Sequence, residues 1–171
     1  MLPGFRRRIV RETVPVGEGV LIRAARREET ELVRALFLEY AAGLDVDLAF
    51  QGFDDELAGL PGNYVALLVA EQEGAVVGCV GVREFEPGVA ELKRLYVRRS
   101  ARGGGLGRAL TTHALARARE AGFASIRLDT LPTMAAATEL YRRLGFQPLP
   151  RPLGATGHFS CDRWYALDLT A

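Results

Sequence analysis

The sequence predicts an α/β protein with a mixed, largely antiparallel central sheet that is splayed at a β-bulge and flanked by helices. The order of hydrophobic patterns is strand, helices, three strands, helix, strand, helix, strand. Two apolar runs meet at Glu73-Gly74, which is a hairpin signal. Lys93 and Arg94 are consecutive polar residues inside an apolar strand, where simple alternation cannot place both. A β-bulge near Arg94–Leu95 would restore the register, although exposure of one residue at the end of the sheet would explain the pattern equally well.

The first part of the chain contains one strand, one long helix and an irregular acidic stretch. "VLIRAA" (20–25) reads as a short strand, and residues 28–43 carry apolar side chains at helical spacing up to Gly43. The acidic stretch that follows contains at most one short helix near 53–59, which Pro61-Gly62 interrupts.

The rest of the chain alternates strands with two helices. The hairpin over 64–85 has a nearly all-apolar second strand, which is typical of a strand covered on both faces. The expected elements after it are strands over 88–97, 125–130 and 161–170, and helices that run from the glycine loop to about Ala121 and over 134–145.

Composition limits the class of protein. The 171 residues carry a formal net charge of +1, so no strong field favours nucleic acid or acidic partners. Cys79 and Cys161 lie far apart and the chain has two histidines, so no metal site is expected. Neither a signal peptide nor a long apolar run is present, which predicts a cytoplasmic protein without a membrane partner. We expect an N-terminal extension over 1–19 and one domain over 20–171.

A glycine-rich segment, "SARGGGLGRAL" (100–110), leads directly into a predicted helix. Glycines let main-chain N–H groups converge on one point, and the helix adds the positive end of its dipole. Arginines on both sides add full positive charge. The segment therefore predicts a cradle for an anion, most plausibly a pyrophosphate; the alternative is a loop with glycines for turn geometry alone.

Neither common nucleotide-binding motif fits this segment. A Walker loop requires Lys and Ser or Thr after its last glycine, where this chain has Arg108 and Ala109. A GxGxxG fingerprint would need glycine at position 108 or 110, which are Arg108 and Leu110.

The run Arg102-Gly103-Gly104-Gly105-Leu106-Gly107 instead resembles the R/Q-x-x-G-x-G/A motif of the GNAT superfamily of N-acetyltransferases. The strand "LKRLYV" before it and the later segment "LDTLPTMAAATELYRRLGF" also resemble parts of that family at the expected spacing. The resemblance covers roughly residues 20–170 and implies the acyl-CoA N-acyltransferase fold.

The resemblance implies acetyl-CoA as the co-substrate and no metal. Main-chain groups of Leu95 and Val97, freed at the bulge, would pair with the pantetheine arm like an added strand. A backbone N–H at Leu95 or Tyr96 would hold the developing oxyanion. The implied cofactor-binding residues are Leu95, Tyr96, Val97, Arg102, Gly103, Gly104, Gly105, Leu106, Gly107 and Arg108.

Two catalytic residues follow from the resemblance. Tyr141 matches the tyrosine of the LYxxLGF segment and would protonate the leaving thiolate, while its ring packs in the core. Glu91, four residues before Leu95, would accept the proton of the amine through water; alternatively it is the ion-pair partner of an arginine such as Arg83. Many relatives carry Asn where this chain has Met134, so the contact of that Asn with the cofactor arm must be absent or replaced by Thr133 or Thr138.

The expected activity is direct transfer of the acetyl group to a primary amine of a small molecule. The acidic residues between the first helix and the second strand would suit a cationic acceptor, although an ordinary solvated loop explains them as well. The alternatives are a protein N-terminal or lysine acetyltransferase and a non-catalytic module that senses acyl-CoA. Homodimers are common in the family, so a homodimer is a further expectation. The acidic residues between the first helix and the second strand, which would suit a cationic acceptor, are Asp45, Asp47, Asp54, Asp55 and Glu56.

Overall fold

The computed structural model describes residues 14–44, 46–48, 52–152 and 163–171. Its centre is one eight-stranded sheet in the order β1-β2-β3-β4-β5-β6-β8-β7. All neighbouring pairs are antiparallel except β5 and β6, which are parallel. The strands are β1 (Val14–Gly17), β2 (Val20–Ala24), β3 (Ala66–Gln72), β4 (Ala75–Glu86), β5 (Val89–Val97), β6 (Ser125–Thr130), β7 (Gln147–Leu149) and β8 (Arg163–Asp168).

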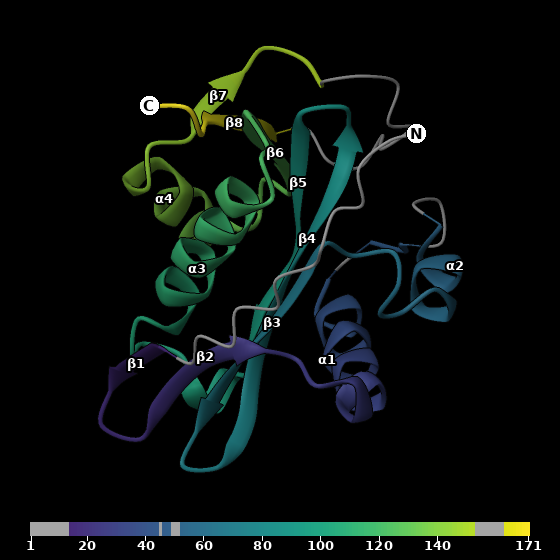
Figure 1. The fold of residues 1–171 in the computed structure, drawn as a ribbon, viewed down its shortest axis with the longest axis vertical. Coiled ribbons are helices and arrows are strands. Elements are labelled where there is room, and N and C mark those ends of the chain that lie inside the picture. The colour runs from purple at the N-terminus through teal and green to yellow at the C-terminus, as the bar shows by residue number, and fades with distance from the viewer. Residues whose placement is uncertain (1–13, 45, 49–51, 153–162) are drawn as a thin grey trace, which may run out of the picture.

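Helices cover both faces of the sheet (Figure 1). The helices α3 and α4 pack on one face, where Leu110, Ile126 and Phe146 belong to one apolar core. The helices α1 and α2 lie over the other face, where Phe37 and Val69 belong to a second core. The helices are α1 (Thr30–Ala42), α2 (Phe53–Ala58), α3 (Leu106–Glu120) and α4 (Ala135–Arg143), with short 3-10 turns at Arg27–Glu29 and Arg99–Ala101.

The sheet opens between its two parallel strands. The pairing of β5 with β6 extends only from Val89 to Glu91 on the β5 side. Beyond that point the two strands diverge, as Figure 1 shows. The second half of β5 consequently has a backbone edge that no strand of the described residues covers, which is a place where an extended ligand can add to the sheet.

A β-bulge in β5 lies at the start of this opening. Cys79 pairs with Tyr96 and Gly81 pairs with Lys93, so Arg94 and Leu95 together face a single residue of β4. Arg94 has a φ of 57°, in the left-handed region that a residue with a Cβ rarely occupies. The splayed, bulged sheet expected from the Lys93-Arg94 pattern is thus confirmed.

The expected elements are present, and two short strands were missed. The hairpin turn at Glu73-Gly74 has positive φ at both residues, which matches the twist of β3 and β4. β7 was not predicted, and neither was β1, which pairs with β2 at the edge of the sheet. β1 falls within the stretch 1–19 that the sequence assigns to an extension; the division at residue 19 otherwise stays a prediction. Among the described residues, no helix is both long enough and apolar enough for a membrane crossing.

Candidate active site

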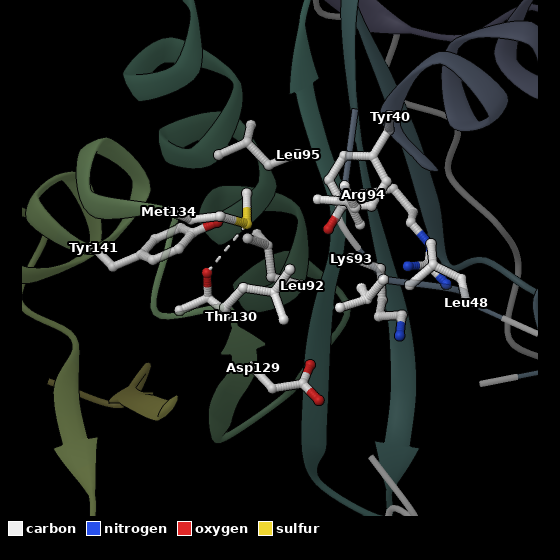
Figure 2. Close-up of a pocket in the computed structure, with 13 residues that line it drawn as sticks. Tyr40, Leu48, Leu92, Lys93, Arg94, Leu95, Asp129, Thr130, Met134 and Tyr141 are labelled. Atoms are coloured by element: carbon white, nitrogen blue, oxygen red, sulfur yellow. Dashed lines mark hydrogen bonds between the residues drawn. The ribbon is translucent and has the colours of Figure 1, made fainter. Parts of the chain in front are cut away.

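A pocket lies at the opening between β5 and β6. The lining comes from β5, from the end of β6 and the loop after it, from α1 with the loop that follows it, and from α4. Figure 2 shows Lys93 and Arg94 on one side and Tyr141, Met134 and Thr130 on the other. The lining residues are Tyr40, Leu44, Val46, Leu48, Leu92, Lys93, Arg94, Leu95, Asp129, Thr130, Leu131, Met134 and Tyr141.

Arg94 is held in place by a buried carboxylate. Its Nη2 and Nε donate to the two oxygens of Glu56 at 2.6 and 2.9 Å, and the hydroxyl of Tyr64 also donates to Glu56. The guanidinium lies over the ring of Phe53, at 5.0 Å from its centroid. Burial is the largest single influence and by itself would raise the pKa of Glu56, but the hydrogen bonds and charge of Arg94, with smaller contributions from the Tyr64 hydroxyl and Lys93, together lower the pKa. Glu56 is therefore a structural anion, not one of the solvated loop carboxylates expected from the sequence.

Lys93 enters the same pocket without such a partner. The residue is 5 % exposed and makes no hydrogen bond or ion pair with any residue that the structure describes. Burial lowers the pKa of its ammonium, because the charged form loses its water shell. Sequence reasoning used Lys93 only as a sign of the bulge; two charged residues in an apolar strand were the signal that could have placed it in the site.

Tyr141 contributes a buried hydroxyl to the pocket. It comes from the last part of α4, and its ring packs edge-on against Phe146 with centroids 5.6 Å apart. Burial raises the pKa of the phenol well above its ordinary value, so the group holds its proton at neutral pH. The expected combination of a packed ring and a hydroxyl at the site is consistent with these contacts.

Met134 lines the pocket at the position where many relatives carry Asn. Its Sδ accepts a 3.5 Å hydrogen bond from the hydroxyl of Thr130. One turn further along α4, the Oγ1 of Thr138 is buried and has no hydrogen-bond partner among the described residues. Thr133 is exposed. Of the two threonines expected to replace the Asn contact, Thr138 is the one with an unused buried hydroxyl.

Glu91 lies outside the residues that line the pocket. Its carboxylate is 1 % exposed and accepts hydrogen bonds from Arg83 Nε at 2.6 Å and from Arg127 Nη1 at 2.9 Å. The ion pair with Arg83 that the sequence left open as an alternative is present. The role of Glu91 as a base is a separate matter and stays a prediction.

The glycine loop is exposed and surrounded by open space in front of α3. Gly103 and Gly105 have φ angles of 91° and 79°, and a Cβ built on either glycine or on Gly104 would meet nothing within 4 Å. Gly105 is the N-cap of α3 and supplies no side chain to its first turn, so the amides of Leu106 and Gly107 can point at a ligand. Arg108 is exposed in the same turn.

The loop adjoins the free edge of β5. Arg102 folds back, so that its Nε donates to the carbonyl of Val97 at 2.8 Å and its guanidinium lies over the ring of Tyr96. The hydroxyl of Tyr96 donates to Glu39, which also pairs with Arg98. Arg102 thus ties the start of the glycine loop to the end of β5.

Comparison with known proteins identifies this arrangement. Residues 29–146 match the model of the acetyltransferase (GNAT) family. The chain belongs to the GNAT family. An N-acetyltransferase of Schizosaccharomyces pombe is 38% identical over 120 residues, which are 67% of this chain and 74% of the relative. The N-acetyltransferase YjgM of Escherichia coli K12 is 35% identical over 140 residues, which are 77% of this chain and 81% of the relative.

Solved GNAT structures share the fold. An acetyltransferase of the GNAT family from Staphylococcus aureus Mu50 has a TM-score of 0.73 at 20% identity, covering 88% of this chain and 99% of that one. The acetyltransferase yncA of Salmonella typhimurium, solved with acetyl-CoA, has a TM-score of 0.70 at 21% identity, covering 88% and 94%. The predicted family and fold are therefore confirmed.

GNAT acetyltransferases use acetyl-CoA, and the residues of this chain fit that molecule. The open space at Gly103–Gly105 has room for a pyrophosphate beside the amides of the first turn of α3, and the edge of β5 beyond Glu91 offers main-chain groups to an extended arm. The Oγ1 of Thr138 is buried without a hydrogen-bond partner among the described residues, and Thr138 is not one of the residues that line the pocket.

Several polar residues that the sequence analysis singled out either lie outside the described residues or lie away from the pocket. Asp45 and Cys161 lie outside the described residues. Asp47, Asp54 and Asp55 are exposed and do not line the pocket. The site residues that sequence reasoning missed are Tyr40, Lys93, Arg94, Asp129 and Thr130, and Glu56, expected at the acceptor site, is instead the ion-pair partner of Arg94.

Proposed function

We propose that the protein transfers the acetyl group of acetyl-CoA directly to the primary amine of a small molecule. The observation that carries this proposal is that Tyr141 and the bulge residue Leu95 line one pocket, next to the free edge of β5. The protonated hydroxyl of Tyr141 and the backbone edge of β5 at Leu95 can thereby both contact the acetyl thioester. The buried side chains that form much of the pocket lining favour a small acceptor over a protein segment.

When bound, acetyl-CoA supplies an acetyl group activated as a thioester. The first task of this chain is to hold the cofactor, with the amides of residues 103–107 on the pyrophosphate and the main chain of Leu95 and Val97 along the arm. The hydroxyl of Thr138 takes the place of the Asn contact. A Thr138→Val variant should raise the KM for acetyl-CoA about two- to tenfold, the worth of one hydrogen bond.

The remaining tasks concern charge and protons. The reaction forms an N–C bond and breaks the C–S bond, so the oxygen of the acetyl group gains negative charge and sulfur departs as a thiolate. A backbone N–H at Leu95 or Tyr96 stabilises the oxygen, and the hydroxyl of Tyr141 protonates the thiolate. Glu91 accepts the proton of the amine through water in this scheme, despite its ion pairs with Arg83 and Arg127.

Calorimetric titration of the purified protein with acetyl-CoA tests the proposal, with dephospho-CoA and ATP as matched ligands. Micromolar binding of acetyl-CoA, followed by release of free thiol with an amine panel, would support it. Tight binding without turnover of any amine would instead support the acyl-CoA sensing module. Absence of binding by folded protein would contradict both.

A further inference from the structure

The pocket contains one charge that its surroundings do not balance. Among the described residues that line it, the charged ones are Lys93, Arg94 and Asp129. Arg94 is neutralised by the bidentate contact with Glu56. The Oδ2 of Asp129 lies 3.6 Å from the Nη2 of Arg127, so Asp129 forms an ion pair with that arginine. Lys93 alone among the three has no ion-pair partner within the described chain.

The nearby carboxylates are already engaged by arginines. Glu91 and Asp129 attract the ammonium of Lys93 at longer range, and Arg94 and Arg83 repel it. Glu91 is shared between Arg83 and Arg127. When Lys93 is protonated, this cluster therefore carries one positive charge in excess, and the ammonium that carries it is buried and lines the pocket.

A buried ammonium without a counter-ion is unfavourable, and an anionic ligand in the pocket would supply the missing counter-charge to Lys93. Lys93 lies two residues before Leu95, a span of about 7 Å along the strand. Since a lysine side chain can cover such a distance, its ammonium can meet an anionic group that lies a few bonds from the reacting amine. Most of the other residues that line the pocket are apolar, so they can pack against a hydrocarbon side chain of the acceptor.

We propose that Lys93 binds the carboxylate of the acceptor, and that the acceptor is an amino acid with an apolar side chain. This inference rests on the proposed acetyl transfer, because it names the class of amine that the same pocket takes. The charge–charge contact sets the orientation of the acceptor, with its carboxylate toward Lys93 and its amine toward Leu95 and Tyr141. Lys93 is thus a specificity residue of the acceptor site.

Matched acceptors test the proposal in the wild-type protein. L-leucine, L-valine and L-phenylalanine are compared with their carboxamides by thiol release from acetyl-CoA. We expect kcat/KM to be about 10- to 150-fold higher for the carboxylates, as for hydrogen bonds to a charged group. Equal or better turnover of the carboxamides would overturn the proposal.

The variant Lys93→Met keeps the length and apolar stem of the side chain and removes its charge. We expect it to abolish the preference by raising KM for the amino acids, while the carboxamides change less than about threefold. Arg119→Met, which removes one exposed charge from α3, is the control and should keep the preference. An equal fall in kcat for both acceptor classes would identify Lys93 as a proton acceptor and overturn the proposal.

A binding measurement separates this inference from the failure of the proposed function. The wild-type protein is titrated with 4-methylpentanoate, which is leucine without its amine, and with 4-methylpentanamide. Preferential thermal stabilisation by the carboxylate, lost in Lys93→Met, supports the anion site even if no amine is acetylated. No preference in the wild-type protein overturns it, whether or not acetyl-CoA is turned over.

Discussion

Lys93 and Arg94 are neighbours in the chain, yet both side chains lie against the same pocket instead of on opposite faces of the sheet. The bulge and the left-handed backbone at Arg94 account for this, because together they suspend the alternation of β5. Arg94 then reaches Glu56, whereas Lys93 has no hydrogen-bond or ion-pair partner among the described residues. One backbone irregularity thus supplies the site with one cation that is neutralised by Glu56 and one that no described residue neutralises.

Glu56→Gln should destabilise the protein, because it leaves the buried Arg94 without its counter-charge. We expect a loss of about 3–5 kcal/mol in the free energy of unfolding, measured with urea. Asp54→Asn, on the exposed side of α2, is the matched control and should change stability by less than about 0.5 kcal/mol. Similar values for the two variants would contradict the ion pair.

The same carboxylate should make stability depend on pH. Because its pKa is lower in the folded protein than the ordinary 4.5, the contribution of Glu56 is complete above about pH 4.5 and declines as the pH falls below it. The unfolding free energy of Glu56→Gln should therefore fall less steeply below pH 4.5 than that of the wild-type protein. Parallel curves would show that another group is responsible.

Gly105→Glu should abolish acetyl-CoA binding, because it adds bulk and negative charge in front of the first turn of α3. We expect the Kd measured by calorimetry to rise at least about 100-fold. Gly122→Glu is the control, since Gly122 also has positive φ (87°) and open space but lies beyond the other end of α3. Both variants carry similar backbone strain, so equal loss of binding would attribute the effect to strain.

Tyr141→Phe should lower kcat about 100-fold or more, because the leaving thiolate loses its proton donor. The KM for acetyl-CoA should change little. Tyr165→Phe removes a hydroxyl from a ring that packs against Tyr141 but does not line the pocket, so its turnover should match the wild-type value. Unchanged turnover of Tyr141→Phe would leave this tyrosine a purely structural role.

Glu91→Gln separates the two roles considered for this carboxylate. Its loss leaves Arg127, which is fully buried, without a full counter-charge, and should cost about 3–5 kcal/mol of stability. If Glu91 is also the base, kcat of the folded variant falls and the acidic limb of its pH profile disappears. Wild-type kcat with reduced stability would restrict Glu91 to the ion pairs. Glu84→Gln, exposed on the neighbouring β4, is the control.

The family, the splayed sheet and the glycine loop before a helix followed from the sequence, because each depends on residues close together in the chain, while the role of the loop as an anion cradle stays a prediction. The cradle needs only consecutive glycines between a strand and a helix, and the hairpin at Glu73-Gly74 needs only a local turn. The bulge was recognisable for the same reason, since Lys93 and Arg94 interrupt a local alternation.

Only the tertiary structure decided which charges are neutralised. Glu56 and Arg94 are 38 residues apart, and Glu91 and Arg127 are 36 apart, so no local pattern links either pair. Glu56 accordingly looked like one member of a solvated acidic stretch, and Lys93 looked like a structural marker. Whether a charge is paired or free depends on what the fold packs against it, and this determines the chemistry of the pocket.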